Sequence, residues 1–403
     1  MKTYQILFAL YAFLHISAIA VAETHNGTCG EKATWAFDDE TGALTISGSG
    51  NMANYSFGSQ GNAPWIEYRR EITSVDIADG ITSIGDVAFY NCSNLTHISV
   101  PNSVTAIGTN AFCGCGNLTF IALPNSIKQI GTYAFYFCTR LTSVNIPEGI
   151  AVIDTCTFSN CTALTSVAIP SSVSEIKEGA FYACSTLTTT EIPSSVNVIE
   201  RNAFHGCKGL RSVVIGSGVK AIGDNAFSSC PALKQVYVSW EKPIKVGANV
   251  FENENGNIPA VLFVPTGKTD EYKSADIWPN FSGIQEWKDV AEIVATGIQL
   301  NATEKAIKLG YHTQLKATLL PADYYPIVTW STSNANVATV SGNGYVTAVS
   351  TGEAIITAST SNGLVATCRI RVSDNKKGQT SNDIRLKAAP IDRLIYKTFG
   401  RMR

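Results

Sequence analysis

The sequence has few charged residues and no surplus of either sign of charge. Charged residues make up 15% of the 403 residues, and the formal net charge is −2. Proteins that bind DNA or RNA neutralise phosphates with clustered Lys and Arg, so this balance argues against a nucleic-acid partner. Few charges combined with abundant Ser, Thr and Asn are typical of β-rich extracellular proteins.

The sequence also lacks the motifs of common catalytic sites. It contains no Gly-x-Ser-x-Gly, no His-Glu-x-x-His and no Gly-rich phosphate loop before a helix. No Cys-x-x-Cys pair or histidine cluster provides a metal site. The histidines beyond residue 22 fall in separate predicted parts of the chain, so we expect no two to be adjacent: His25, His97, His205 and His312. We therefore predict a protein that is not an enzyme and binds no cofactor and no metal.

Long apolar runs are absent except at the N-terminus. A positive start precedes a mostly apolar run over 6–19, which ends in Ala20-Val21-Ala22. This order is typical of a secretory signal peptide, with cleavage before Glu23. The alternative is a retained membrane anchor, although the run is short for a bilayer and contains His15. We predict a signal peptide over 1–22, a secreted or cell-surface protein, and no transmembrane segment in the mature chain.

The most informative feature that is present is a repeat of 23 residues. A Phe recurs at this interval, followed three residues later by Cys and three further on by Leu. The phase holds without an insertion over 72–232, and the phenylalanines are Phe89, Phe112, Phe135, Phe158, Phe181, Phe204 and Phe227. A fixed phase over this distance predicts a solenoid in which each repeat forms one coil stacked on its neighbours.

Each repeat predicts two short extended segments. Alternating apolar residues from Leu141 to Pro147 indicate a short strand, which Pro ends because it cannot donate a ladder hydrogen bond. A second extended segment, such as 173–176, leads into a tight turn around the Ala-Phe pair. Strands stacked coil on coil would lie about 4.8 Å apart. The predicted fold class is therefore mainly β, a solenoid with capping ends followed by a second β domain.

The repeat also determines how the cysteines are interpreted. A residue that occupies one position in every coil forms a column along the inside of the solenoid, where a free thiol behaves as a small hydrophobic group. We predict buried thiols, with disulfides or a metal as the alternatives. The predicted column consists of Cys92, Cys115, Cys138, Cys161, Cys184, Cys207 and Cys230.

The repeated residues resemble a known family. The string LTSVNIPEGIAVIDTCTFSNCTA is similar to the BspA-type leucine-rich repeat, which implies a bacterial surface protein. The strings TWAFDDETGALTISGSGNMANY and VLFVPTGKTDEYKSADIWPNFSGIQEW resemble the caps of such solenoids. Both ends need a cap, because an uncapped solenoid would expose a hydrophobic cross-section. We expect an N-terminal cap over 23–71, the leucine-rich-repeat solenoid over 72–256 and a C-terminal cap over 257–290.

A different pattern begins after the repeats. Residues 294–372 contain short alternating segments separated by turn residues, as in a β-sandwich, so Cys368 and Ile370 would face inward and Arg369 would face water. The string VTWSTSNANVATVSGNGYVTAVSTGEAIITAST is similar to the group 2 bacterial Ig-like domain, which implies a spacer or adhesion module. Residues 373–403 are polar and basic, which predicts a disordered tail or, alternatively, a sorting signal.

The outward strand positions of the solenoid are the candidate binding surface. Most are small and polar, as in Ser143 and Ser166, and only three side chains there are large and aromatic: Phe120, Tyr237 and Trp240. Exposed aromatic residues are enriched in recognition sites, whereas packing against a cap is the structural alternative. We predict these three residues as candidate partner contacts.

These observations predict an exported binding or adhesion protein that recognises a macromolecular partner through the solenoid face. By resemblance, such partners include host extracellular-matrix proteins, and no residue selects among them. Two alternatives stay open, a glycan-binding accessory protein and a purely structural envelope protein. A row of exposed aromatic residues would favour a glycan ligand, and the outward strand positions contain few.

Overall fold

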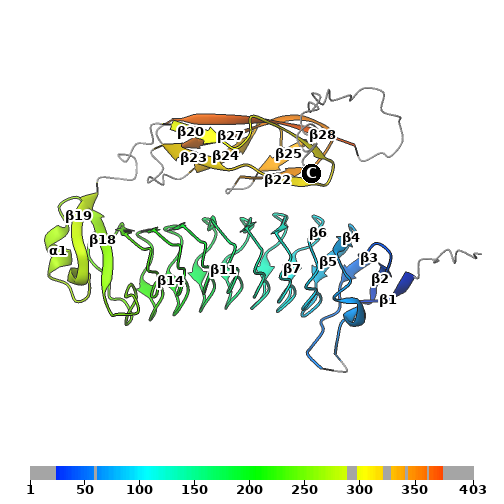
Figure 1. Cartoon of the computed structure of the whole chain (residues 1–403), viewed down its shortest axis with the longest axis horizontal. Helices are drawn as coiled ribbons and strands as arrows, with labels where there is room; N and C mark the ends of the chain where they lie inside the picture. Colours follow the sequence, from blue (N-terminus) through cyan, green and yellow to red (C-terminus); the bar gives the residue numbers. More distant parts are fainter. Residues whose placement is uncertain are drawn as a thin grey trace, which may run out of the picture.

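The computed structural model describes two β domains (Figure 1). A mainly β fold with a solenoid followed by an Ig-like sandwich was predicted, and this fold class is confirmed. The predicted signal peptide and nearly all of the predicted tail lie outside the described residues. Those residues are 24–58, 61–287, 297–320, 328–340, 344–360 and 363–374.

The N-terminal cap converts antiparallel pairing into the parallel pairing of the coils. Strands β1 (Thr24–Thr28), β2 (Lys32–Asp38) and β3 (Ala43–Asn51) form an antiparallel unit. The last of them then pairs in parallel with β4 (Ser74–Ile77) and β5 (Ile81–Ile84), the strands of the first coil. The 3₁₀ turn η1 (Ile66–Tyr68) follows the fully buried Trp65, whose ring closes this end of the core.

The coils contribute short strands to two parallel rows, and in the first row the coil between β10 and β13 contributes only the isolated parallel bridge of Ala168 to Asn145. Partner residues within a row are one repeat apart, as in Val213 paired with Val236, so the sequence period sets the register. The first row contains β4, β6 (His97–Ser99), β8 (Phe120–Ile121), β10 (Ser143–Val144), β13 (Thr189–Ile192), β15 (Ser212–Ile215) and β17 (Gln235–Val238). The second row contains β5, β7 (Ala106–Ile107), β9 (Gln129–Ile130), β11 (Val152–Ile153), β12 (Glu175–Ile176), β14 (Val198–Ile199) and β16 (Ala221–Ile222).

A continuous stack of aromatic rings fills the centre of the solenoid. Neighbouring rings of the seven repeated phenylalanines are nearly parallel, as in Phe135 and Phe158, whose centroids are 5.4 Å apart at an interplanar angle of 3°. Trp65 stacks on the first ring at 5.7 Å, and Phe251 continues the stack beyond the last at 5.5 Å. The apolar cross-section is therefore covered at both ends by aromatic rings from the caps.

The seven repeated cysteines form a second buried column beside the rings. Six of the thiols donate a hydrogen bond to the carbonyl oxygen of the Phe in the preceding coil, as in Cys161 Sγ to Phe135 O at 3.3 Å. The described cysteines are not joined by disulfides. Burial raises the pKa of Cys92 and of Cys184 to about 12, so these groups stay protonated at neutral pH.

The C-terminal cap adds two longer strands to the first row. Strand β18 (Ile258–Pro265) pairs in parallel with β17 and with β19 (Phe281–Trp287). Between them, α1 (Thr269–Lys273) and the 3₁₀ turn η2 (Trp278–Asn280) cross the end of the solenoid. The buried rings of Tyr272 and Trp278 pack there in an edge-to-face arrangement at 5.6 Å.

The second domain is a small β-sandwich. One sheet contains β21 (Glu304–Lys308), β28 (Val365–Ser373), β27 (Gly352–Thr360) and β24 (Val328–Thr332), and another contains β22 (His312–Gln314), β26 (Tyr345–Ala348) and β25 (Ala338–Val340). Strands β20 (Gly297–Leu300) and β23 (Ala317–Leu320) form a separate pair. The predicted alternation is confirmed: Cys368 and Ile370 are buried, and Arg369 is exposed.

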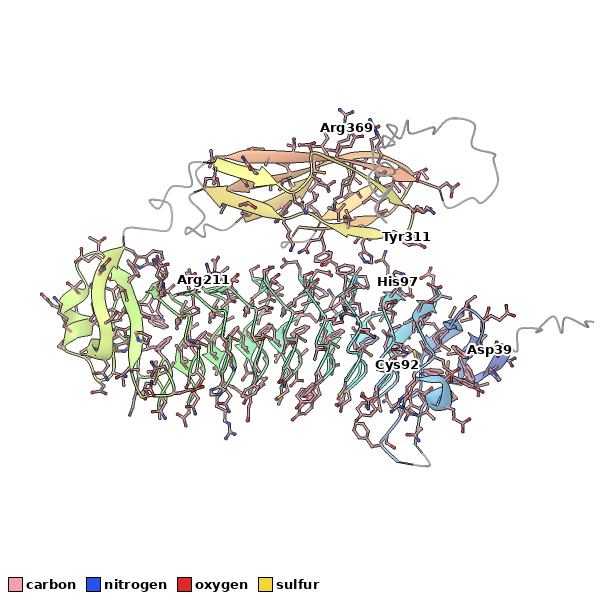
Figure 2. The ribbon with its side chains drawn as sticks, in the orientation of Figure 1. Asp39, Cys92, His97, Arg211, Tyr311 and Arg369 are labelled. Carbon is pink, nitrogen blue, oxygen red and sulfur yellow. The ribbon has the colours of Figure 1, made fainter. Side chains whose placement is uncertain are left out.

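The sandwich lies along the side of the solenoid that carries the first strand row (Figure 1). The ring of Phe120 stacks on Tyr345 with centroids 3.9 Å apart, and it meets His312 at 3.8 Å. His97 stacks on His312 at 5.9 Å and on Tyr311 at 6.0 Å (Figure 2). The expectation that no two histidines are adjacent is therefore wrong, because it did not consider contacts between the two domains.

The contact between the domains depends on a neutral imidazole. Burial, together with the neighbouring His97, lowers the pKa of His312 from 6.5 to about 4. The contact contains two histidines and two tyrosines, and a proton on His312 would be both buried and close to His97. The docked arrangement therefore favours the uncharged form of His312.

The first prediction concerns the cysteine column. We expect denatured protein to react with a thiol reagent at ten more cysteines than native protein, without any reductant, because the seven cysteines of the column and also Cys29, Cys113 and Cys368 are buried and unbonded. Mass spectrometry of labelled native and denatured samples measures this difference. Labelling that appears only after reduction would indicate disulfides.

The second prediction concerns one member of the column. Cys161→Asp should destabilise the protein by on the order of 3 kcal/mol or more, because it buries a carboxylate without a partner. The control Cys161→Ala should cost about 1 kcal/mol, since it removes one small atom. The carbonyl of Phe135 stays paired in both variants, because the amide of Cys138 also donates to it at 3.2 Å. Urea unfolding measures both changes, and equal effects would contradict a buried column.

The third prediction concerns pH. His312 has a lowered pKa when docked, so the undocked state binds more protons between about pH 6.5 and about pH 4. Docking should therefore be strongest above about pH 6.5 and should weaken as the pH falls toward about 4. Small-angle X-ray scattering should show a larger radius of gyration at the lower pH. His312→Gln should reduce this pH dependence, whereas His25→Gln, in the N-terminal cap, should leave it intact.

Candidate binding surface

The strand face, defined as the outward side chains of the first strand row, contains the first predicted contact residue. Phe120 is 8% exposed, because Tyr345 and His312 of the sandwich cover its ring. Ser143, on the next coil, is fully buried. A partner can therefore reach this part of the strand face only when the sandwich moves away.

The other two predicted contact residues lie at the C-terminal cap. Tyr237 stacks on Phe263 with centroids 4.4 Å apart and meets Trp287 edge-on at 5.4 Å. The resulting burial raises the pKa of Tyr237. Trp240 is 5% exposed, and its indole N–H donates to the carbonyl of Val219 at 2.8 Å. Trp240 thus packs as part of the cap, and Tyr237 stays a partly accessible candidate.

A second surface is formed by the tight turns around the repeated Ala-Phe pairs. We call it the turn edge, and it consists of residues 87–91, 110–114, 133–137, 156–160, 179–183 and 202–206. These turns stack along the solenoid because the Phe of each turn belongs to the central column. The residue that follows the Phe therefore occupies an equivalent place in every coil.

Aromatic side chains gather on the turn edge. Phe137 is 45% exposed and Tyr182 is 38% exposed. The ring of Tyr136 lies edge-on to Tyr133 at 5.3 Å and to Phe137 at 4.7 Å. These rings lie on turns, outside the outward strand positions in which contact residues were predicted. The available signal was the recurrence of Tyr directly after the repeated Phe in every second coil: Tyr90, Tyr136 and Tyr182.

Two aromatic residues of the turn edge adopt a backbone conformation that usually requires Gly or Asn. Tyr133 and Phe137 have φ values of 58° and 59°. Equivalent positions in other coils are mostly Asn or Gly: Asn91, Asn110, Gly114, Asn160, Gly179, Asn202 and Gly206. A bulky residue in this region costs roughly 1–3 kcal/mol. Since the ring of Phe137 is largely exposed, core packing does not explain its place there.

The turn edge is also rigid. The amides of Tyr133, Phe135 and Phe137 donate to carbonyl oxygens of the next coil at 3.0, 2.9 and 3.0 Å. Equivalent bonds connect the other coils. Rings held by a paired backbone lose little conformational entropy when they bind a partner.

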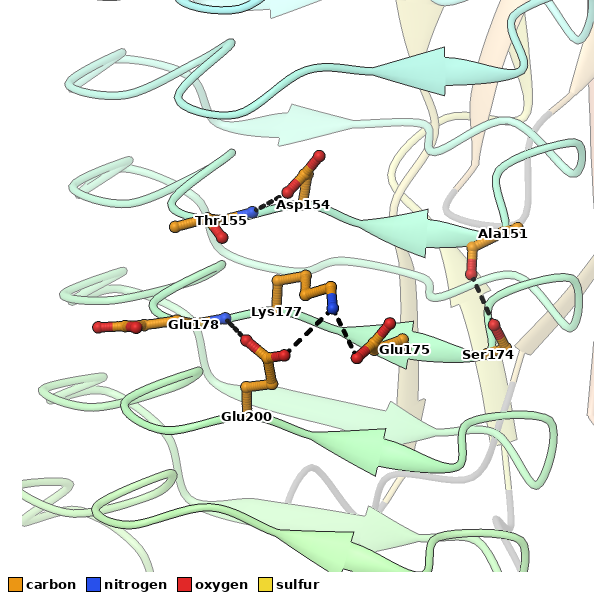
Figure 3. Close-up of polar contacts among 8 residues, drawn as sticks. All are labelled: Ala151, Asp154, Thr155, Ser174, Glu175, Lys177, Glu178 and Glu200. Atoms are coloured by element: carbon orange, nitrogen blue, oxygen red, sulfur yellow. Dashed lines mark hydrogen bonds and ion pairs between the residues drawn. The ribbon is translucent and has the colours of Figure 1, made fainter.

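No Asp, Glu, Lys or Arg occurs within the turn edge. Charged residues flank it. Asp86 and Asp154 accept hydrogen bonds from the backbone amides of Thr109 and Thr155, and other flanking charges form ion pairs. Lys177 contacts Glu175 at 2.7 Å and Glu200 at 3.2 Å, and Arg201 contacts Glu178 at 2.9 Å (Figure 3 shows the Lys177 pairs). The turn edge itself thus has no charged side chain, and Lys177, Glu178 and Arg201 beside it are neutralised by ion pairs.

An open cavity of about 920 Å³ lies in the N-terminal cap. Its lining includes Cys29, Lys32, Tyr55 and Asn62. Burial raises the pKa of Cys29 to about 11, which disfavours the reactive thiolate at neutral pH. The lining also includes Glu31, and the hydroxyl group of Tyr55 donates a hydrogen bond to the carbonyl oxygen of Cys29 at 3.3 Å.

Metal-binding and membrane-spanning features are not found in the part of the chain that the structure describes. Across 24–58, 61–287 and the described parts of the sandwich, His, Cys, Asp and Glu do not form a group of three that could hold a metal. Among the same residues, no helix has the length and apolarity needed to cross a bilayer.

Two protein families match the sequence. The BspA type leucine-rich repeat region matches at residues 67–188 and 130–258, with six copies. The group 2 bacterial Ig-like domain matches at residues 294–370. Together these matches cover the solenoid and the sandwich.

Two curated relatives share part of the sequence. An uncharacterized protein of Clostridium acetobutylicum is 34% identical over 116 residues, which cover 26% of this chain and 29% of that protein. The lacto-N-biosidase of Bifidobacterium bifidum is 36% identical over 174 residues, which cover 34% of this chain and 16% of the enzyme. The chain thus spans less than a third of either relative.

Solved structures of bacterial leucine-rich repeat proteins are also similar. A protein of Bacteroides ovatus has 21% identity and a TM-score of 0.44, with coverage of 70% of this chain and 84% of that chain. The T. pallidum leucine-rich repeat protein has 28% identity and a TM-score of 0.39, with coverage of 51% and 90%. The family matches are the firmer result, and the chain belongs to the BspA-type leucine-rich repeat proteins and carries a C-terminal bacterial Ig-like domain of group 2.

Proposed function

We propose that this chain is an exported adhesion-type binding protein that recognises a macromolecular partner with the outer surface of its solenoid. The single observation that carries the proposal is the group of exposed aromatic rings on the rigid turn edge, among them Phe137 and Tyr182. Exposed clusters of aromatic side chains are uncommon on surfaces without a binding role. Their fixed backbone makes them suitable anchors for a partner.

The family membership supports this proposal. BspA-type repeats and group 2 Ig-like domains are typical of binding and structural proteins of the bacterial surface. The related lacto-N-biosidase is an enzyme, but the similarity covers only 16% of it. This partial similarity gives no reason to assign the activity of that enzyme to this chain. We propose that the chain is not an enzyme.

The strand face provides a second surface of a different kind. Its middle coils present small groups such as Ser166 and Thr189, which make weak individual contacts. Its one large ring near the middle, Phe120, is covered by the Ig-like domain. We propose that the strand face binds a partner only after the Ig-like domain has moved, whereas the turn edge is accessible in the docked arrangement.

The fourth prediction tests the proposed binding role. Purified protein lacking residues 1–22 should bind at least one partner in a panel of immobilised extracellular-matrix proteins, glycans and whole cells. Tyr182→Ala on the turn edge should weaken this binding about tenfold, because it removes an exposed anchor ring. Ser166→Ala on the strand face is the matched control and should change binding little.

Surface plasmon resonance measures the affinities, and thermal unfolding shows whether each variant keeps its fold. Tyr237→Ala provides a comparison at the strand face. If Tyr237→Ala weakens binding and Tyr182→Ala does not, the binding surface is the strand face. The absence of binding to every member of the panel would contradict the proposed role and would favour a purely structural protein.

A further inference from the structure

Tyrosines recur along the turn edge in every second coil. Tyr90, Tyr136 and Tyr182 each follow a column Phe, and the coils between them carry the small, buried Cys113 and Ser159 at the same position. Centroids of consecutive column rings are 5.3 to 5.5 Å apart in this part of the solenoid. Tyrosines two coils apart are therefore spaced by about 10 Å, or two strand spacings.

Neighbouring rings extend this row. Phe57 is 60% exposed and lies edge-on to Tyr90 at 4.9 Å. His205 stacks on Tyr182 at 5.1 Å, and burial lowers the pKa of His205, which keeps it neutral at physiological pH. The row thus continues from the N-terminal cap across the solenoid as a line of uncharged rings.

The polar groups beside the rings are amides and hydroxyls. Asn91 and Asn160 occupy the left-handed position two residues after the column Phe, next to the tyrosines of the neighbouring coils. Thr139 and Thr162 follow the column cysteines. Without a cation or carboxylate in the turn edge, a polyanion or a charged peptide would find no charge to pair with.

We propose that the turn edge binds an uncharged, linear polysaccharide of β-1,4-linked sugars. In such a chain every second sugar presents the same face, and the length of this two-sugar repeat is close to the spacing of the tyrosines. The apolar C–H face of a sugar stacks on an aromatic ring, and its hydroxyls exchange hydrogen bonds with amides and hydroxyls at the side. The proposal rests on the proposed binding function and names its class of partner.

An extended peptide fits the turn edge less well. A peptide that adds to a protein surface needs unpaired backbone groups or a groove for its side chains. The turn amides, such as those of Asn91, Phe112 and Phe158, already donate to the adjacent coil. The aromatic rings project from an outer edge, and the cavity described above lies elsewhere, in the N-terminal cap.

Binding assays with defined sugars test the inference. The full mature chain should be retained on insoluble cellulose or chitin, and cellohexaose or chitohexaose should bind in isothermal titration calorimetry. Tyr136→Ala and Tyr182→Ala should each weaken binding about tenfold, because each removes one stacking platform. Tyr136→Phe keeps the ring and should bind nearly as the parent does. Tyr311→Ala, an exposed tyrosine of the Ig-like domain, is the matched control and should leave binding unchanged.

These assays can distinguish a failure of the polysaccharide site from a failure of the proposed binding function. Thermal unfolding should show the same transition in the parent and in both turn-edge variants, since their rings are partly exposed. Failure to bind any of these sugars, or equal losses in the Tyr311→Ala control, would overturn the polysaccharide site. Binding of a proline-rich peptide or a matrix protein in place of the sugars, with the same dependence on Tyr136 and Tyr182, would also overturn it but would leave the proposed binding function intact.

Discussion

The stack of phenylalanine rings is the constraint on which the rest of this structure depends. Rings spaced by 5.0 to 5.5 Å recur every 23 residues along the solenoid, and the stack continues at 5.5 Å across the 24-residue step from Phe227 to Phe251. The same stack fixes the register of both strand rows and buries the thiols beside it. It must also be closed at its ends, which Trp65 and the Phe251–Trp278–Phe281 group achieve with further rings.

The stack explains why the turn edge is free to vary. The residue after each column Phe lies outside the ring stack and is held by the coil, so it can be the partly exposed Tyr90 or the small, buried Cys113 and Ser159. A surface that is rigid yet released from packing is well suited to recognition. The left-handed backbone at Tyr133 and Phe137 recurs in the other coils, including at Val87 and Ala183, so it belongs to the repeated turn.

Period and alternation in the sequence were sufficient to predict the solenoid and the sandwich, whereas the cap segments were predicted from their resemblance to known caps. They were sufficient because both features depend on contacts that repeat regularly. In the solenoid these join adjacent coils, as in Phe135 with Phe158, and in the sandwich they join paired strands, as in Ile356 with Cys368. The contact of Phe120 with Tyr345 could not be predicted in this way, since it joins surfaces without a common period. The tyrosines of the turn edge follow the repeated Phe and could have been found from this recurrence, but contact residues were predicted only on the strands. One of those predicted residues, Trp240, packs in the cap.

The two surfaces of the solenoid differ in what controls access to them. The described ring contacts between the domains involve His97 and Phe120, both on the strand face. Because the lowered pKa of His312 links this contact to pH, acidification would uncover the strand face and leave the turn edge unchanged. Binding at the turn edge should then depend less on pH, since the one histidine of that edge is His205, whose pKa burial lowers. A partner of the strand face would instead gain affinity in acid, so the pH profile of binding assigns a ligand to one surface or the other.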